Sequence, residues 1–116
     1  MKKIVIIIVT SFVLMIIACS KSNDSSGSAT DCSGATKSFA TDVNPIIQSF
    51  CTTNSGCHAS GSTNGPGALT TYQQVYNNRA AIRTAVENGS MPQNSSLSTS
   101  QKSAIICWID NGASDN

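Results

Sequence analysis

The sequence has one histidine, His58, and few charged side chains, because Asp, Glu, Lys and Arg make up 11% of its 116 residues. A Ser-His-Asp triad would need that histidine as its base, yet His58 directly follows a cysteine in a motif of another kind. The chain also lacks a glycine-rich phosphate loop, a paired-carboxylate site and a basic stripe that could follow a phosphate backbone. These absences argue against triad, carboxylate-pair and phosphate-loop enzymes and against a nucleic-acid partner.

The N-terminus has the pattern of an export signal. Two lysines precede an apolar run over residues 4–17, which Ala18 and Cys19 close. The run is shorter than the ~20 apolar residues that span a bilayer, so it predicts a cleaved signal over residues 1–18. Its ending, Ile-Ile-Ala-Cys, resembles the lipobox of bacterial lipoproteins, in which the cysteine is acylated. The resemblance implies a cell-envelope lipoprotein anchored in a membrane through Cys19, the alternative being an ordinary signal peptide with an incidental cysteine.

The exported chain divides into a tether and a small domain. Loss of the signal leaves five basic and six acidic residues, so this part is nearly neutral. Residues 19–38 are mostly Ser, Gly, Asn, Thr and Asp and predict a flexible tether. The domain is expected over residues 39–113, followed by a tail over 114–116. A domain of about 75 residues seldom gains enough stability from an apolar core alone, so it needs a staple.

Helical periodicity predicts an all-α domain. Apolar positions from Val43 to Phe50 form one stripe, with Thr41 and Asp42 as capping residues and Pro45 in the first turn. Two short helices are expected between Leu69 and Gly89, with a break at Asn77 and Asn78. A last helix should open at the capping box that starts at Ser98 and end at Asn111 and Gly112. The expected core consists of Val43, Ile46, Ile47, Phe50, Leu69, Tyr72, Val75, Tyr76, Ile82, Val86, Ile105, Ile106, Trp108 and Ile109.

Two cysteines and the histidine lie within eight residues, Cys51-Thr52-Thr53-Asn54-Ser55-Gly56-Cys57-His58. This is a stretched form of the haem-attachment signature C-x-x-C-H, in which two thiols bond the haem and the histidine ligates the iron. Five residues separate the thiols instead of two. On a continuous helix, cysteines six apart would point about 240° away from each other. Residues 52–56 must therefore loop out if both thiols are to bond one haem.

Met91 is the one methionine that follows the signal. It precedes Pro92, which pushes it out of helical conformation and onto a loop. A loop methionine can simply fill a gap in the core. Beside His58, however, it completes the one His/Met pair that the exported chain offers to iron. We therefore expect one haem per chain, held by Cys51 and Cys57 and ligated by His58 and Met91.

Four segments resemble monohaem c-type cytochromes, most closely the planctomycete-type cytochrome c domains. They are residues 39–47 (FATDVNPII), 57–58 (CH), 89–92 (GSMP) and 107–113 (CWIDNGA). The resemblance covers residues 39–113 and implies three to four short helices around one covalent haem, with the first and last helices packed together. It also implies an electron carrier and not an enzyme. We expect a monomer that exchanges electrons with redox proteins yet to be identified.

Cys32 and Cys107 should also be bonded, because an exported chain folds where thiols oxidise. Alongside the resemblance, we favour Cys51 and Cys57 on haem with a disulfide between Cys32 and Cys107, since this leaves no thiol free. The alternative pairs Cys51 with Cys107 and attaches haem by one thioether. Two other functions stay open. One is a zinc-stapled domain that uses Cys51, Cys57, His58 and Cys107, and the other is a cofactor-free, disulfide-stapled binding lipoprotein of the cell envelope.

Overall fold

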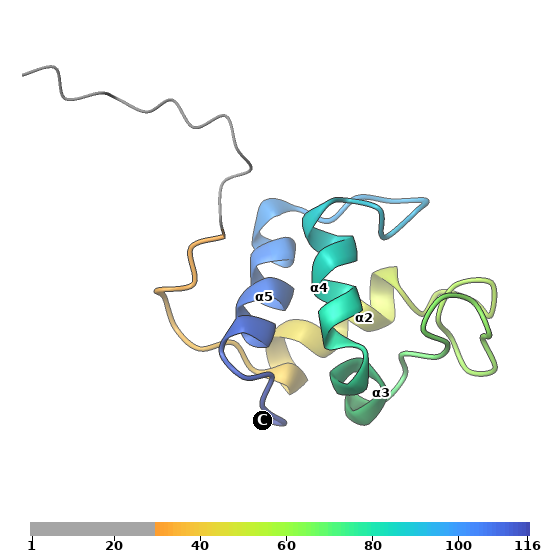
Figure 1. The fold of residues 1–116 in the computed structure, drawn as a ribbon, viewed down its shortest axis with the longest axis horizontal. Helices are drawn as coiled ribbons and strands as arrows, with labels where there is room; N and C mark the ends of the chain where they lie inside the picture. The colour runs from red at the N-terminus through yellow and green to blue at the C-terminus, as the bar shows by residue number, and fades with distance from the viewer. Residues whose placement is uncertain (1–29) are drawn as a thin grey trace, which may run out of the picture.

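The structure is a computed structural model that describes residues 30–116. It contains the π-helical turn η1 (Phe39–Val43) and the α-helices α2 (Asn44–Phe50), α3 (Tyr72–Asn77), α4 (Arg79–Glu87) and α5 (Thr99–Asp110) (Figure 1). Helices make up 45% of the described residues, and none of these residues is in a strand. The expected all-α class is confirmed. The export signal, Cys19 and the tether up to residue 29 lie outside the described residues.

The first helical segment begins earlier than the sequence predicts. Ser38 caps η1, because its Oγ accepts a hydrogen bond from the Thr41 amide at 3.4 Å. The Asp42 carboxylate accepts one from the Ser38 amide at 2.8 Å. The prediction of Thr41 and Asp42 as the caps is therefore wrong, because both lie inside the turn that Ser38 opens. Pro45 does lie in the first turn of α2, where an amide proton has no helical partner.

The other helix ends agree with the sequence signals. Asn78 separates α3 from α4. After α4, Gly89 has a φ of +75°, the left-handed conformation that favours glycine at helix ends. At the start of α5, the Ser98 hydroxyl accepts a hydrogen bond from the Gln101 amide and the Gln101 side chain accepts one from the Ser98 amide. Short local motifs thus determine where these helices begin and end.

Helix α5 is the centre of the domain and packs against both α4 and η1. Trp108 of α5 is 1% exposed, and its ring centroid lies 5.4 Å from that of Phe39. Phe39, Leu97 and Ala113 are buried although the expected core did not include them, since each lies outside a periodic apolar run. The buried core consists of Phe39, Val43, Ile47, Leu69, Val75, Ile82, Val86, Leu97, Ile105, Ile106, Trp108 and Ala113.

The residues after α5 return to the start of the domain. The Ser114 carbonyl accepts a hydrogen bond from Trp108 Nε1 at 2.9 Å. The Asn116 side-chain oxygen accepts one from the Phe39 amide at 3.0 Å, and its backbone oxygen accepts one from the Ala40 amide at 2.9 Å. Residues 114–116, which the sequence suggested only as a tail, thus connect the end of the described chain to η1.

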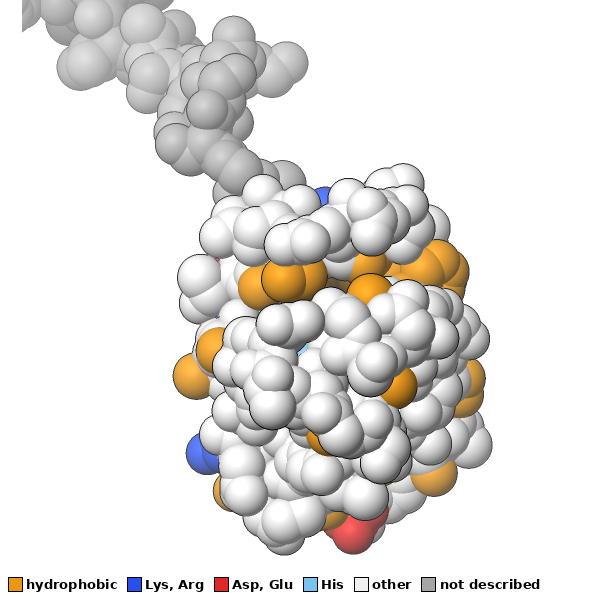
Figure 2. Space-filling model, turned by 90° about the vertical axis from the view of Figure 1, so that its right-hand side faces the viewer, with side chains coloured by type: hydrophobic (Ala, Val, Ile, Leu, Met, Phe, Trp, Pro, Cys, Tyr) orange, Lys and Arg blue, Asp and Glu red, His pale blue; other side chains and the backbone are white. Residues whose placement is uncertain are grey.

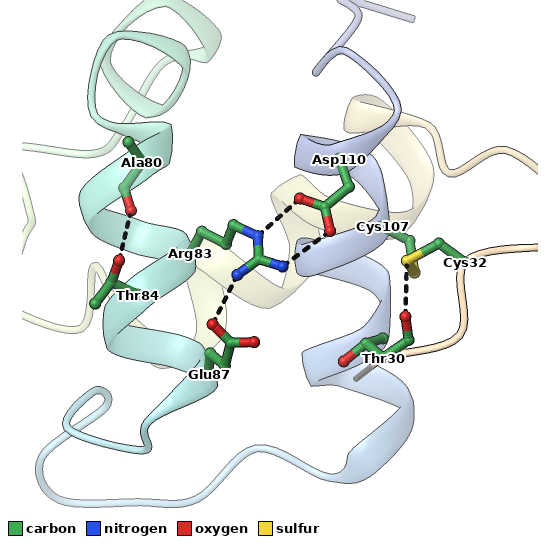
Figure 3. Close-up of polar contacts among 8 residues, drawn as sticks. All are labelled: Thr30, Cys32, Ala80, Arg83, Thr84, Glu87, Cys107 and Asp110. Atoms are coloured by element: carbon green, nitrogen blue, oxygen red, sulfur yellow. Dashed lines mark hydrogen bonds and ion pairs between the residues drawn. A yellow bond between two sulfur atoms is a disulfide. The ribbon is translucent and has the colours of Figure 1, made fainter. Parts of the chain in front are cut away.

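Two cross-links hold α5 to its surroundings (Figure 3). A disulfide joins Cys107 of α5 to Cys32, which precedes η1 by several residues. On the α4 side, Arg83 Nε and a terminal nitrogen contact the two Asp110 carboxylate oxygens at 2.7 and 3.0 Å, and Arg83 also pairs with Glu87. The hydrogen bonds from Arg83 lower the pKa of Asp110. Helix α5 is therefore linked on one side to the incoming chain and on the other to α4.

We expect loss of the disulfide to reduce the free energy of unfolding by about 4 kcal/mol, because it releases a loop of 75 residues in the unfolded chain. The measurement is urea unfolding of Cys32→Ser/Cys107→Ala against wild type in the same cofactor state. Alanine is chosen at position 107 because this side chain is buried. A difference below about 1 kcal/mol would contradict a stapling role for the disulfide.

Candidate functional site

A cavity of about 840 Å³ is lined by all four residues that the sequence suggested for haem: Cys51, Cys57, His58 and Met91. Its lining residues lie at the C-terminal end of α2, in the loop that follows α2 and in the loop that joins α4 to α5. Figure 1 shows these segments. Figure 2 views this side of the molecule and shows the pale-blue histidine at the bottom of a hollow. The fold thus brings together two segments that are distant in the sequence.

The chain leaves the helix between the two cysteines. The His58 amide donates a hydrogen bond to the Cys51 carbonyl at 2.9 Å, which closes the loop. Inside it, the Asn54 side-chain oxygen accepts hydrogen bonds from the amides of Gly56 at 2.8 Å and Cys57 at 3.2 Å. This compact loop lets both cysteines line the same cavity, which a continuous helix would not allow. The loop is what a haem bonded by both thiols requires.

The two thiols of the cavity are partly buried, and neither is in a disulfide. Burial, with a smaller effect from the nearby Cys57 thiol, raises the pKa of Cys51 to about 11. The Thr53 hydroxyl donates a hydrogen bond to Cys57 Sγ at 3.4 Å. Cys51 is therefore a neutral thiol at pH 7 and adds no charge to the cavity.

His58 is held in a form that can ligate a metal. Its side chain is buried, and Nδ1 lies 2.9 Å from the Gly67 carbonyl oxygen. Since a carbonyl oxygen only accepts hydrogen bonds, Nδ1 carries the proton, and in the neutral imidazole Nε2 keeps its lone pair. Among the described residues, no hydrogen bond reaches Nε2. A hydrogen bond of this kind fixes the tautomer and the ring orientation of metal-ligating histidines.

The loop over residues 59–67 supports His58, a role that the sequence did not reveal. Gly67 supplies the carbonyl that orients the imidazole, and it has a φ of +85°. A Cβ atom at Gly65 would come within 3.2 Å of His58 Cε1, so a larger residue would crowd the ring. The glycines on either side of Pro66 signal an unusual backbone, but they do not identify the side chain that this backbone serves.

Met91 lies in the loop between α4 and α5, as the following proline predicts. Its amide donates a hydrogen bond to the Ala85 carbonyl at 3.2 Å, and its peptide bond to Pro92 is cis. The side chain is partly buried and lines the same cavity as His58. This backbone hydrogen bond thus connects Met91 to helix α4.

Cys107 does not contribute to this cavity. Its sulfur is bonded to Cys32, so the alternative disulfide between Cys51 and Cys107 is not formed. The four-residue zinc set is not assembled either, and within residues 30–116 no group of three or more His, Cys, Asp and Glu side chains is placed to hold a metal ion. The disulfide itself suits a haem-binding domain and a cofactor-free domain equally.

The chemistry of the cavity fits a covalent haem. Two thiols, an imidazole with a free Nε2 and a thioether are the donors that such a group requires. Phe50 and Pro92 contribute apolar surface to the walls. The volume of about 840 Å³ lies within the range of about 300–1,000 Å³ that is usual for ligand and cofactor pockets.

Comparisons with protein-family models, curated proteins and solved structures find no match for this chain. The resemblance to c-type cytochromes therefore rests on the four sequence segments. Over residues 30–116, no helix is both long and apolar enough to cross a membrane.

Proposed function

We propose that this protein is a lipid-anchored c-type cytochrome that carries single electrons in a bacterial cell envelope. The observation that carries this function is that Cys51, Cys57, His58 and Met91 line one cavity. They come from two separate segments, so their common location does not follow from proximity in the sequence. On this basis we assign the domain to a cytochrome c-like fold.

The four residues divide into two pairs. Cys51 and Cys57 would hold haem through thioether bonds, and His58 and Met91 would ligate its iron. When bound, the haem would supply reversible one-electron chemistry. The Gly67 carbonyl keeps the proton on His58 Nδ1 and leaves Nε2 for the iron. Because Cys51 is a neutral thiol, it brings no charge into the site before attachment.

The proposed anchor is the acylated Cys19, which lies outside the described residues. It would keep the domain at a membrane surface beside its redox partners. No residue of the cavity is assigned a role in catalysis on a substrate, because the bonded and ligating groups account for its two thiols and its one imidazole. The protein is therefore proposed to be a carrier and not an enzyme.

The test is expression of the full chain in a host that matures c-type haem. We expect a red protein whose intact mass includes one haem and whose chromophore survives denaturation and acid extraction, because thioether bonds are covalent. A colourless protein without the added mass would overturn the cytochrome function. That outcome would favour a cofactor-free, disulfide-stapled binding lipoprotein.

A further inference from the structure

Three Asn-Gly pairs occur in the chain, at residues 64–65, 88–89 and 111–112. In such a pair, the glycine amide nitrogen can attack the carbonyl carbon of the asparagine side chain. A bond forms between these two atoms, the bond from that carbon to the side-chain nitrogen breaks, and ammonia leaves with the amide proton. Glycine favours the attack because it has no side chain and adopts conformations that other residues resist. The product is a succinimide ring, which water opens to aspartate or isoaspartate.

Two of the three pairs lie at helix ends, in a conformation that is unsuited to this attack. The ψ angle is −6° at Asn88 and 13° at Asn111. A ψ near zero places the following nitrogen beside the asparagine's own amide nitrogen and away from its side chain. Shortly after these asparagines, the amides of Met91 and Ala113 donate hydrogen bonds back to α4 and α5, at 3.2 and 2.8 Å. Rotation about ψ would break these hydrogen bonds, so the helix ends oppose ring closure.

The pair of Asn64 and Gly65 lies outside the helices, in the loop between α2 and α3. Both residues are exposed, and the Gly65 amide forms no hydrogen bond among the described residues. The attacking nitrogen is therefore not held in place by a partner. We infer that Asn64 is a site of spontaneous deamidation, and that it converts to aspartate or isoaspartate before the two helix-end asparagines do.

Two structural requirements bring this reactive pair into the wall of the cavity. Gly65 has a φ of +57°, and a Cβ atom there would come within 3.2 Å of His58 Cε1, so the position requires glycine. The Asn64 side-chain nitrogen donates a hydrogen bond to the Gly56 carbonyl at 2.9 Å. This bond joins the loop that supports His58 to the loop between the two cysteines. The residues that shape the cavity therefore also make its wall chemically labile.

Deamidation of Asn64 would alter this wall. An ionised carboxylate has no proton to donate, so the hydrogen bond to Gly56 is lost. The carboxylate also adds a negative charge to a cavity whose lining includes no Asp, Glu, Lys or Arg side chain. Isoaspartate further lengthens the backbone of the turn that the Gly67 amide closes on the Asn64 carbonyl at 3.0 Å. Because this turn presents the Gly67 carbonyl to His58, the modification weakens the support of the imidazole.

The experiment incubates the purified full chain at mildly alkaline pH and follows each Asn-Gly pair separately by peptide mapping with mass spectrometry. Labelling with an isoaspartyl methyltransferase identifies the isoaspartate. We expect Asn64 to convert about fivefold faster than Asn88 or Asn111, which corresponds to a barrier lower by about 1 kcal/mol. Conversion of either helix-end asparagine at the same rate as Asn64, or faster, would overturn the inference.

Two variants test the consequence of the modification. Asn64→Gln keeps an amide, but its longer side chain would have to close a larger ring, which forms far more slowly. Asn64→Asp supplies the aspartate product directly. On incubation, the urea midpoint of the wild type should fall toward that of Asn64→Asp, whereas the midpoint of Asn64→Gln should not change. Equal falls in the wild type and in Asn64→Gln, or an Asn64→Asp variant as stable as the wild type, would contradict a structural effect at Asn64.

The modification site does not depend on the proposed function. The peptide masses have the same meaning in a protein with or without haem, and unfolding is compared in one cofactor state. A colourless protein would overturn the proposed function alone. Slow conversion of Asn64 in a red protein would overturn the modification site alone.

Discussion

Cys57→Ala is expected to abolish stable covalent attachment of haem, whereas Cys51→Ala should leave one thioether bond. Cys57 directly precedes His58, so a thiol and an axial ligand come from consecutive residues. Cys51 lies at the end of α2 and is separated from His58 by the loop over residues 52–57. A hydrogen bond from the His58 amide to the Cys51 carbonyl closes this loop. Intact mass and the absorption spectrum of the exported variants after acid extraction measure the effect.

The two cysteine variants control for each other. Both remove a partly buried thiol that is free of disulfide bonding, so general damage to the fold should affect them similarly. Far-ultraviolet circular dichroism checks that each remains helical. A haem content of Cys57→Ala equal to that of wild type would contradict the assignment of Cys57 as the attachment residue next to the iron ligand.

Met91→Leu is expected to retain covalent haem but to lose the near-infrared charge-transfer band of a methionine-ligated ferric haem. Leucine keeps the apolar bulk at this partly buried position, so packing alone should cost less than about 1.5 kcal/mol. The hydrogen bond from the position 91 amide to Ala85 uses backbone atoms and is kept. Loss of the sulfur ligand should lower the reduction potential by on the order of 0.1 V or more. Absorption spectroscopy and protein voltammetry measure the two effects.

Few side chains could replace the Met91 sulfur as a ligand to the iron. After residue 18, the chain contains no other methionine and no second histidine. Lys102 is the cation to control for, because its Nζ lies 3.9 Å from the Cβ position of Gly89, two residues before Met91. The double variant Met91→Leu/Lys102→Gln therefore separates an empty position from a lysine-ligated one. An unchanged spectrum and potential in Met91→Leu would make Met91 a packing residue and would replace the carrier role with ligand sensing or another activity.

Local sequence signals were sufficient for most helix ends. The capping box at Ser98 and the glycine at position 89 act within a few residues, and the structure uses both. The start of η1 was predicted a few residues late, although Ser38 and Asp42 form a local cap there. The long-range hydrogen bond from the Phe39 amide to the Asn116 side chain, 77 residues away, could not be predicted in this way. Contacts of that kind leave no local pattern.

In the candidate site, too, some features could be predicted from the sequence and others could not. The sequence placed Cys51, Cys57, His58 and Met91 in one site, and the structure lines one cavity with them. The support of His58 by the Gly67 carbonyl was not predictable, because a backbone acceptor carries no residue type that would identify it. The spacing of the cysteines required a loop, but only the fold shows that Asn54 organises that loop.

In the proposed lipoprotein, the disulfide at Cys32 would limit how far the domain can stand from the membrane. Because Cys32 is bonded to α5, the span that separates an acylated Cys19 from the domain is 13 residues and does not extend to Ser38. At about 3.4 Å per residue, its maximum reach is about 45 Å, and reduction of the disulfide would add about 20 Å. In Figure 1, α5 lies at the left of the domain, and the loop between α2 and α3, which contributes His58 to the cavity, lies at the right. In the proposed lipoprotein, this reach would set the height above the bilayer at which the domain could meet a partner.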